Sequence, residues 1–164
     1  MNISDYSEQP ATTILAGPEL VQVRFEKLED SPQVSGLEAQ VRFDLGLVRL
    51  GLDQVAVQLT GIVEDPPHFL AQVAYRAAFE LQAAPRTPEA RELLLREICA
   101  RTAPTVLFPF VRETITNLCA KSGLGVRTLP VVDFAEVFAY ERVPVPPLQA
   151  PAEASNPTPV AGQD

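Results

Sequence analysis

The residue types that usually carry catalysis are few in this chain, and their spacing does not assemble a reactive site. His68 is the only histidine and follows two prolines in a predicted exposed turn, so neither a Ser–His–Asp triad nor a metal site with several histidines can form. The 21 acidic residues are scattered, and no pair has a spacing that suggests a general acid and a general base. We therefore expect that the protein is not an enzyme and has no catalytic residue, no metal site and no cofactor.

Two further motifs could carry chemistry. Cys99 and Cys119 fall at apolar positions of predicted helices, and in a reducing compartment we favour buried, unreactive thiols over a disulfide or a catalytic cysteine. The Gly123-Leu124-Gly125 run is similar to a phosphate-binding loop, but such a loop follows a strand and begins a helix. Here the run follows a predicted helix, so we interpret it as a helix C-terminus and a loop.

Composition narrows the class of protein. The 164 residues, of which 46% are hydrophobic, fit one domain with a small core. The formal net charge of -8 repels phosphate backbones and predicts that nucleic acid is not a partner. The longest apolar run, residues 106–111, is too short for a membrane span, so we expect no membrane insertion. No Lys or Arg precedes Arg24, which argues against a secretory signal and predicts a cytoplasmic protein.

The apolar periodicity predicts a small antiparallel sheet. Residues 37–47, 55–63 and 69–81 alternate between apolar and other side chains, and their short links predict consecutive hairpins. An earlier run from Leu20 to Leu28 predicts the first strand, and residues 30–36 the loop that leaves it. One side of such a sheet needs helices to cover it, whereas the other side can face solvent.

Two helices should supply that cover. Thr87 as N-cap and Pro88 at the first helical position predict the start of a long helix that ends at Gly123. Pro104 and Pro109 should bend or interrupt it, because a proline is tolerated only in an opening turn. Asp133 and Glu136 predict a capping box for a short last helix. The predicted fold is α+β, with a four-stranded, Greek-key-like antiparallel sheet and both helices packed on one face.

The chain ends should lie outside this domain. We expect a flexible N-terminal tail at residues 1–18, the domain at 19–143, and a disordered tail rich in proline and alanine at 144–164.

One segment is similar to a known family. Residues 107–116 read Leu-Phe-Pro-Phe-Val-Arg-Glu-Thr-Ile-Thr and closely resemble the start of a helix in the SecB family of protein-export chaperones. Residues 69–73 resemble the family's last strand, and residues 129–134 resemble the lead-in to its final helix. The resemblance implies an ATP-independent chaperone, or holdase, that binds non-native preproteins for Sec-dependent export. It also implies a homotetramer built as a dimer of dimers.

The connection between the two predicted helices is unusually apolar for a loop, and its side chains suit either core packing or the wall of a groove. The resemblance implies a groove for extended polypeptide, formed with the loop after the first strand. That first loop is shorter here than the family's usual version and has no aromatic residue, which predicts different clients or weaker capture of aromatic side chains. The predicted client contacts are Val34, Leu37, Leu124, Val126, Leu129, Val131 and Phe134.

The resemblance further implies docking of the SecA translocation motor on the sheet. Leu70 matches a leucine of that contact and Glu29 matches an acidic residue, but the second acidic position is Gln72. Two other functions therefore stay open. One is a SecB-like chaperone dedicated to a single client, such as the antitoxin of a toxin–antitoxin system, and the other is a small-ligand binding protein or enzyme on a sheet-and-helix fold.

Overall fold

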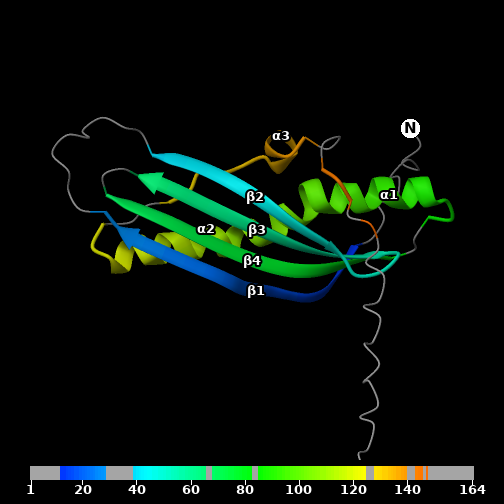
Figure 1. Ribbon diagram of the computed structural model, residues 1–164, viewed down its shortest axis with the longest axis horizontal. Coiled ribbons are helices and arrows are strands. Elements are labelled where there is room, and N and C mark those ends of the chain that lie inside the picture. The colour runs from blue at the N-terminus through cyan, green and yellow to red at the C-terminus, as the bar shows by residue number, and fades with distance from the viewer. Residues whose placement is uncertain are drawn as a thin grey trace, which may run out of the picture.

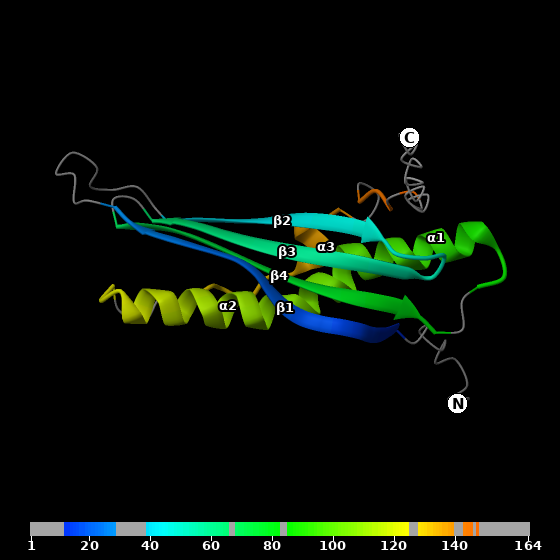
Figure 2. The same cartoon turned by 60° about the horizontal axis from the view of Figure 1, so that its bottom comes forward.

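The computed structural model describes residues 12–28, 39–65, 68–82, 85–124, 128–139, 143–145 and 147. A four-stranded sheet forms one layer, and a long helical segment runs along one of its faces (Figures 1 and 2). The strands are β1 (Thr12–Lys27), β2 (Gln40–Arg49), β3 (Gln54–Asp65) and β4 (Phe69–Leu81). The helices are α1 (Pro88–Glu97), the π-helix η1 (Ile98–Thr102), α2 (Ala103–Lys121) and α3 (Phe134–Val137).

The predicted Greek-key-like topology is confirmed. The strand order is β1-β4-β3-β2 and every pair is antiparallel. Strands β2, β3 and β4 follow one another as hairpins, whereas β1 lies at the opposite edge from β2, its successor in the chain. β1 and β2 are therefore the two edge strands.

The core lies between the inner face of the sheet and α2, which runs over β3 and β4. Val57 and Val73 supply fully buried side chains from the sheet, and Leu107 and Val111 supply them from α2. Helix and sheet approach closely at Gly61, where an added Cβ would lie 2.6 Å from Val111 Cγ1. This glycine sets the depth at which α2 sits on the sheet.

The first strand is longer than the sequence predicts. β1 begins at Thr12, well before the expected start at Leu20, so residues 12–18 belong to the sheet and not to the predicted tail at 1–18. Period-two alternation fails there because the pairing with β4 shifts register between Ile14 and Ala16 and again between Ala16 and Glu19. Gly17, with a φ of 94°, allows this irregular backbone. The remainder of that predicted tail, residues 1–11, lies outside the described residues.

The long helix starts as predicted, with Thr87 Oγ1 accepting a hydrogen bond from Ala90 N at 3.3 Å and Pro88 in the first turn. The predicted interruption is a π-helical turn, in which Ala103 N donates to Ile98 O, directly before Pro104. Pro104 has no backbone N–H to donate to the helix. It is tolerated here because the π-helical turn before it already interrupts the regular hydrogen-bond ladder. The prediction that Pro109 lies in the opening turn of a helix was wrong, because Pro109 lies inside α2. Its ring is exposed there and displaces no core side chain.

The last helix is short, and its predicted N-cap is confirmed. Asp133 Oδ1 accepts a hydrogen bond from Ala135 N at 2.9 Å. Beyond it, Val143 is buried and Val145 packs against the core, so ordered packing continues past the predicted domain end at 143. Most of the predicted tail at 144–164 lies outside the described residues.

Candidate functional site

Four phenylalanines from three parts of the chain meet at the β2 side of the molecule. Phe43 of β2 makes edge-to-face contacts with Phe108 of α2 at 5.7 Å and with Phe134 of α3 at 5.4 Å between ring centroids. Phe108 and Phe134 also meet edge to face at 5.4 Å, and Phe138 stacks on Phe134 at 5.8 Å. We call these four residues the aromatic cluster. The contacts fix the position of α3, whose own four residues are too few to hold it in place.

An apolar groove of about 430 Å³ opens beside this cluster, beneath the inner face of β2. One wall comes from β2 and the other from the chain after α3. Asp44 is the one lining residue with a charged side chain, and its position in the strand places that side chain on the outer face. We call this groove the β2 groove, and its lining residues are Phe43, Asp44, Leu45, Leu47, Phe138, Val143 and Pro144.

The β2 groove lies next to a free strand edge. In the described sheet β2 pairs only with β3, so its other edge presents backbone N–H and C=O groups without strand partners. A chain added to that edge would place alternate side chains on the inner face, where Leu45 and Leu47 are half-buried. The geometry therefore suits an extended polypeptide, which would use backbone hydrogen bonds for affinity and the apolar wall for side chains.

A second hollow, of about 340 Å³, lies on the far side of Phe108 along α2. Its lining includes Arg112, Glu113, Thr116 and Asn117 of α2, and Thr128 closes it from the connection between the helices. Phe108 lines this hollow and is also a member of the aromatic cluster, so the cluster separates the two hollows. A segment longer than one strand could contact both.

The predicted client contacts divide into three groups. Leu129 and Phe134 are buried, with 4% and 2% of their surfaces exposed, and Leu124 is half-buried against the core. Val131 is 86% exposed. Val34, Leu37 and Val126 lie outside the described residues. Of the predicted contacts, Phe134 is the one that belongs to the aromatic cluster.

No sequence motif marks the β2 side of the groove as a binding site. Phe43, Leu45 and Leu47 have the alternation of an ordinary inner strand face, and nothing in that pattern says whether a helix covers them. Phe138 and Val143 follow a short helix and carry no recognisable motif. The apolar character of residues 43, 45 and 47 was the only available signal.

Two of the three predicted motor-docking residues, Leu70 and Gln72, lie on the opposite, outer face of the sheet. Leu70 and Gln72 are both half-buried on β4, and Glu29 lies outside the described residues. The cross-strand neighbours of Leu70 are Glu26 and Glu64. Each of these glutamates is paired with an arginine, at 2.6 Å to Arg24 and 3.5 Å to Arg42.

The cysteine and histidine side chains are placed as the sequence predicts. Cys99 and Cys119 are both buried and not disulfide-bonded, which confirms the prediction of buried thiols. Burial, helped by the charge of Glu92, raises the pKa of Cys99 to about 12. His68 is exposed, as predicted. Within the described ranges no three His, Cys, Asp or Glu side chains are grouped to hold a metal ion.

Comparison with known proteins gives the family. Residues 27–143 match the family model described as preprotein translocase subunit SecB. The chain belongs to the SecB family. This confirms the resemblance drawn from residues 107–116, and the family is one of chaperones.

Individual SecB proteins match over different lengths. The protein-export protein SecB of Anaplasma marginale (strain Florida) is 37% identical over 85 residues, which is 52% of this chain and 46% of that protein. The chain thus spans about half the length of that relative. The protein-export protein SecB of Chromobacterium violaceum is 28% identical over 144 residues, which is 82% of this chain and 89% of that protein.

The fold also matches a solved structure. The SecB-like chaperone Rv1957 of Mycobacterium tuberculosis, in complex with a ChAD peptide from the antitoxin HigA1, has a TM-score of 0.59 at 17% identity. The match covers 74% of this chain and 90% of that one. None of the helices in the described part of our chain is long and apolar enough to cross a membrane.

Proposed function

We propose that this protein is an ATP-independent holdase that binds extended, non-native polypeptide and keeps it competent for Sec-dependent export. The observation that carries the proposal is the β2 groove, an apolar wall that follows a free strand edge. Membership in the SecB family supports the same function. A holdase of this kind acts in the cytoplasm, without catalysis, because binding the unfolded state is by itself enough to oppose aggregation.

Affinity should come from many weak contacts. Each apolar side chain buried in the β2 groove contributes about 1–3 kcal/mol, part of which offsets the entropy of ordering the client. Long segments that reach past the aromatic cluster to the second hollow should therefore bind much more tightly than short peptides.

The direct test is suppression of aggregation. A chemically denatured model client is diluted into buffer with or without the protein, in the absence of ATP, and light scattering is followed. Scattering should fall as the protein is added, and fragments of the client should compete more strongly as their length increases. Unchanged scattering at a several-fold excess of folded protein would contradict the proposed function.

The predicted contacts on the helix connection remain part of this proposal. Val131, being 86% exposed, can be changed without disturbing the core. Val131→Asp should weaken client binding while leaving the thermal midpoint unchanged, and Val48→Asp, at a 42% exposed site on the outer face of β2, is the control for added charge. Equal binding by both variants and the parent would remove the connection from the client surface.

We also propose a homotetramer, built as a dimer of dimers. The inner face of β1 presents Ile14, Leu20 and Val23 with 44%, 48% and 43% of their surfaces exposed. Beside them Phe110 of α2 is 39% exposed and contacts Tyr75 at 5.7 Å. Such an apolar strip is costly in water, and a second copy would cover it. Sedimentation at micromolar concentration tests this, since a stable monomer would contradict it.

Docking to SecA is proposed through the outer face around Leu70. Glu26 and Glu64 supply carboxylates beside Leu70, but their pairing with Arg24 and Arg42 leaves little net negative charge. Gln72→Glu should therefore strengthen binding to SecA, measured by calorimetry at low salt, with Gln58→Glu on the same face as the control. If Gln72→Glu binds no better than the parent, charge at this position does not limit docking.

A chaperone dedicated to one client is the second candidate. The fold match to a SecB-like chaperone solved with an antitoxin peptide supports it. Competition separates the two functions, because a general holdase should bind several unrelated denatured proteins with similar affinity, whereas a dedicated one should prefer a single sequence strongly.

A further inference from the structure

Helix α1 is fastened to the sheet mainly by charged side chains. Arg49, at the end of β2, lies 3.2 Å from Glu92 of α1 and also donates hydrogen bonds to Gly51 O and Leu52 O in the β2–β3 turn. Arg91 Nε lies 2.6 Å from Asp53 Oδ1 in the same turn, and both atoms are shielded from water. Two ion pairs therefore join one helix to one hairpin, which lie side by side in Figures 1 and 2.

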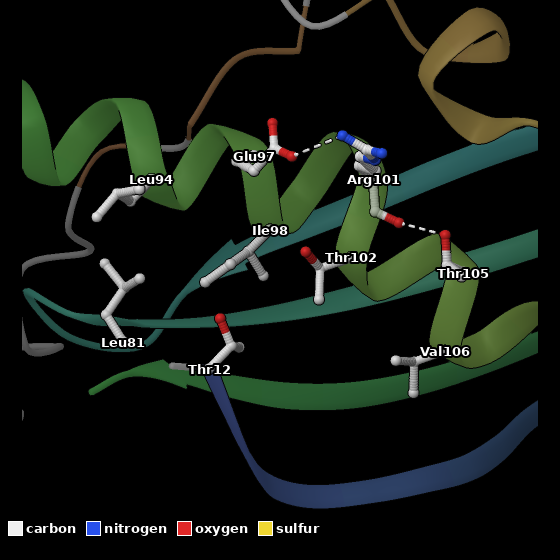
Figure 3. A pocket seen from close by; sticks show the side chains of 9 residues that line it. All are labelled: Thr12, Leu81, Leu94, Glu97, Ile98, Arg101, Thr102, Thr105 and Val106. Atoms are coloured by element: carbon white, nitrogen blue, oxygen red, sulfur yellow. Dashed lines mark hydrogen bonds and ion pairs between the residues drawn. The ribbon is translucent and has the colours of Figure 1, made fainter. Parts of the chain in front are cut away.

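The apolar attachment of α1 is thin by comparison. Leu95 is its one fully buried residue, Leu94 is half-buried, and Leu93 is 50% exposed. A cleft of about 470 Å³ lies between the helical segment and the ends of β1 and β4, where Ile98 and Thr102 point toward Thr12 (Figure 3). The side chains of α1 are thus incompletely packed on this side of the helix.

The π-helical turn η1 separates α1 from α2. Widened turns of this kind are common at functional sites and at bends, because the regular hydrogen-bond ladder is broken there. Cys99 lies within η1, is fully buried, and contacts water only if the segment moves. This placement makes Cys99 a reporter of the position of α1.

We propose that α1 is an ion-pair latch, which swings away from the sheet about η1 when the Arg49–Glu92 and Arg91–Asp53 pairs are broken, while α2 and the sheet stay folded. The opening uncovers Leu95, Ile98 and Cys99, so rising ionic strength converts a closed apolar patch into an exposed one. The residues of the latch are not among those that line the β2 groove, although α3 packs against η1.

The test measures the rates at which a thiol reagent labels the two cysteines of the full chain. Cys119 is also fully buried but lies near the end of α2, away from α1, so it reports opening of the remaining structure. Raising NaCl should accelerate labelling of Cys99 relative to Cys119, because the four side chains of the two pairs keep 12–36% of their surfaces exposed and salt still weakens such pairs, though less than fully exposed ones. Labelling of Cys99 should depend only weakly on denaturant, as a local opening does, and labelling of Cys119 steeply.

Asp53→Asn removes one charge with almost no change in size and should speed labelling of Cys99 about 5- to 30-fold, the factor expected for losing one partly buried pair. The variant Glu92→Gln is less suitable, because the charge of Glu92 also raises the pKa of Cys99. Glu97→Gln is the matched control, since its partner Arg101 lies 3.6 Å away on the same helical segment (Figure 3) and not on the hairpin.

The outcomes separate cleanly. Faster labelling of Cys99 alone in Asp53→Asn, with Glu97→Gln like the parent, supports the latch. Equal acceleration of both cysteines, or equal salt and denaturant dependence in the parent chain, means that only global unfolding exposes Cys99 and overturns it. The parent measurement decides the question even if Asp53→Asn does not fold.

Discussion

The two edge strands of the sheet differ in how far the rest of the chain covers their inner faces. At the β2 edge, α3 and the chain that follows it turn back over the inner face and form the aromatic cluster, so a groove remains with an apolar wall and a free strand edge. At the β1 edge the same face carries exposed Leu20 and Val23. The inner face is therefore partly covered at the β2 edge, whereas at the β1 edge apolar side chains are exposed.

This difference suggests two kinds of partner. A groove of limited width, with a strand edge beside it, accepts one extended segment of varied sequence, because the backbone supplies much of the binding. A flat apolar strip suits a constant surface of matching shape, such as a second copy of the chain. The following predictions test this assignment, in order of expected effect.

The largest effect should come from the phenylalanines on either side of Pro109. Phe108 is 8% exposed and belongs to the aromatic cluster, so Phe108→Ala should lower the free energy of unfolding by about 3–5 kcal/mol. Phe110 faces the β1 side and is 39% exposed, so Phe110→Ala should lower the free energy of unfolding by about 1 kcal/mol or less. Denaturant unfolding at one protein concentration compares them. Similar losses would mean that the two sides are equally packed.

The next prediction concerns subunit association at the β1 edge. Leu20→Asp should weaken subunit association by about 2–3 kcal/mol, or roughly 30- to 150-fold in the dissociation constant, because the leucine surface that a second copy would cover is lost. Gln22→Asp on the same strand is the control, since Gln22 pairs with Ala74 on the outer face. Analytical ultracentrifugation should show dissociation in the first variant only. Dissociation in both would implicate net charge and not the apolar strip.

The third prediction concerns the β2 groove. Leu45→Ser should weaken binding of a denatured client by about 1–2 kcal/mol, or about tenfold, with the oligomer intact. Val48→Ser lies on the same strand, but on the outer face and 42% exposed, and should bind clients like the parent. Fluorescence anisotropy with a labelled client measures both. Equal affinities would place the client elsewhere.

Much of this architecture is encoded locally and could be predicted. Alternation in residues 55–63 and 69–81, and the Thr87-Pro88 helix start, gave strands and a helix that the structure confirms. The first half of β1 was missed because its register shifts around Gly17 remove the period-two pattern. The groove was missed for a different reason. Whether Leu45 is core or binding surface depends on where Val143 and Pro144 return, and that is set by tertiary packing and not by local sequence.

The smallest expected effect tests whether α3 matters for the groove more than for stability. Asp133 Oδ1 caps α3 through Ala135 N at 2.9 Å, and Thr87 Oγ1 caps α1 through Ala90 N at 3.3 Å. Either cap changed to alanine should cost about 1 kcal/mol of local helix stability. Only Asp133→Ala loosens Phe134 and Phe138 beside the groove, so only this variant should reduce client affinity, by about fivefold. Parallel measurements of thermal unfolding and client anisotropy distinguish the two. If Thr87→Ala reduces client affinity as much, the loss reflects general destabilisation, and the aromatic cluster does not shape the β2 edge for binding.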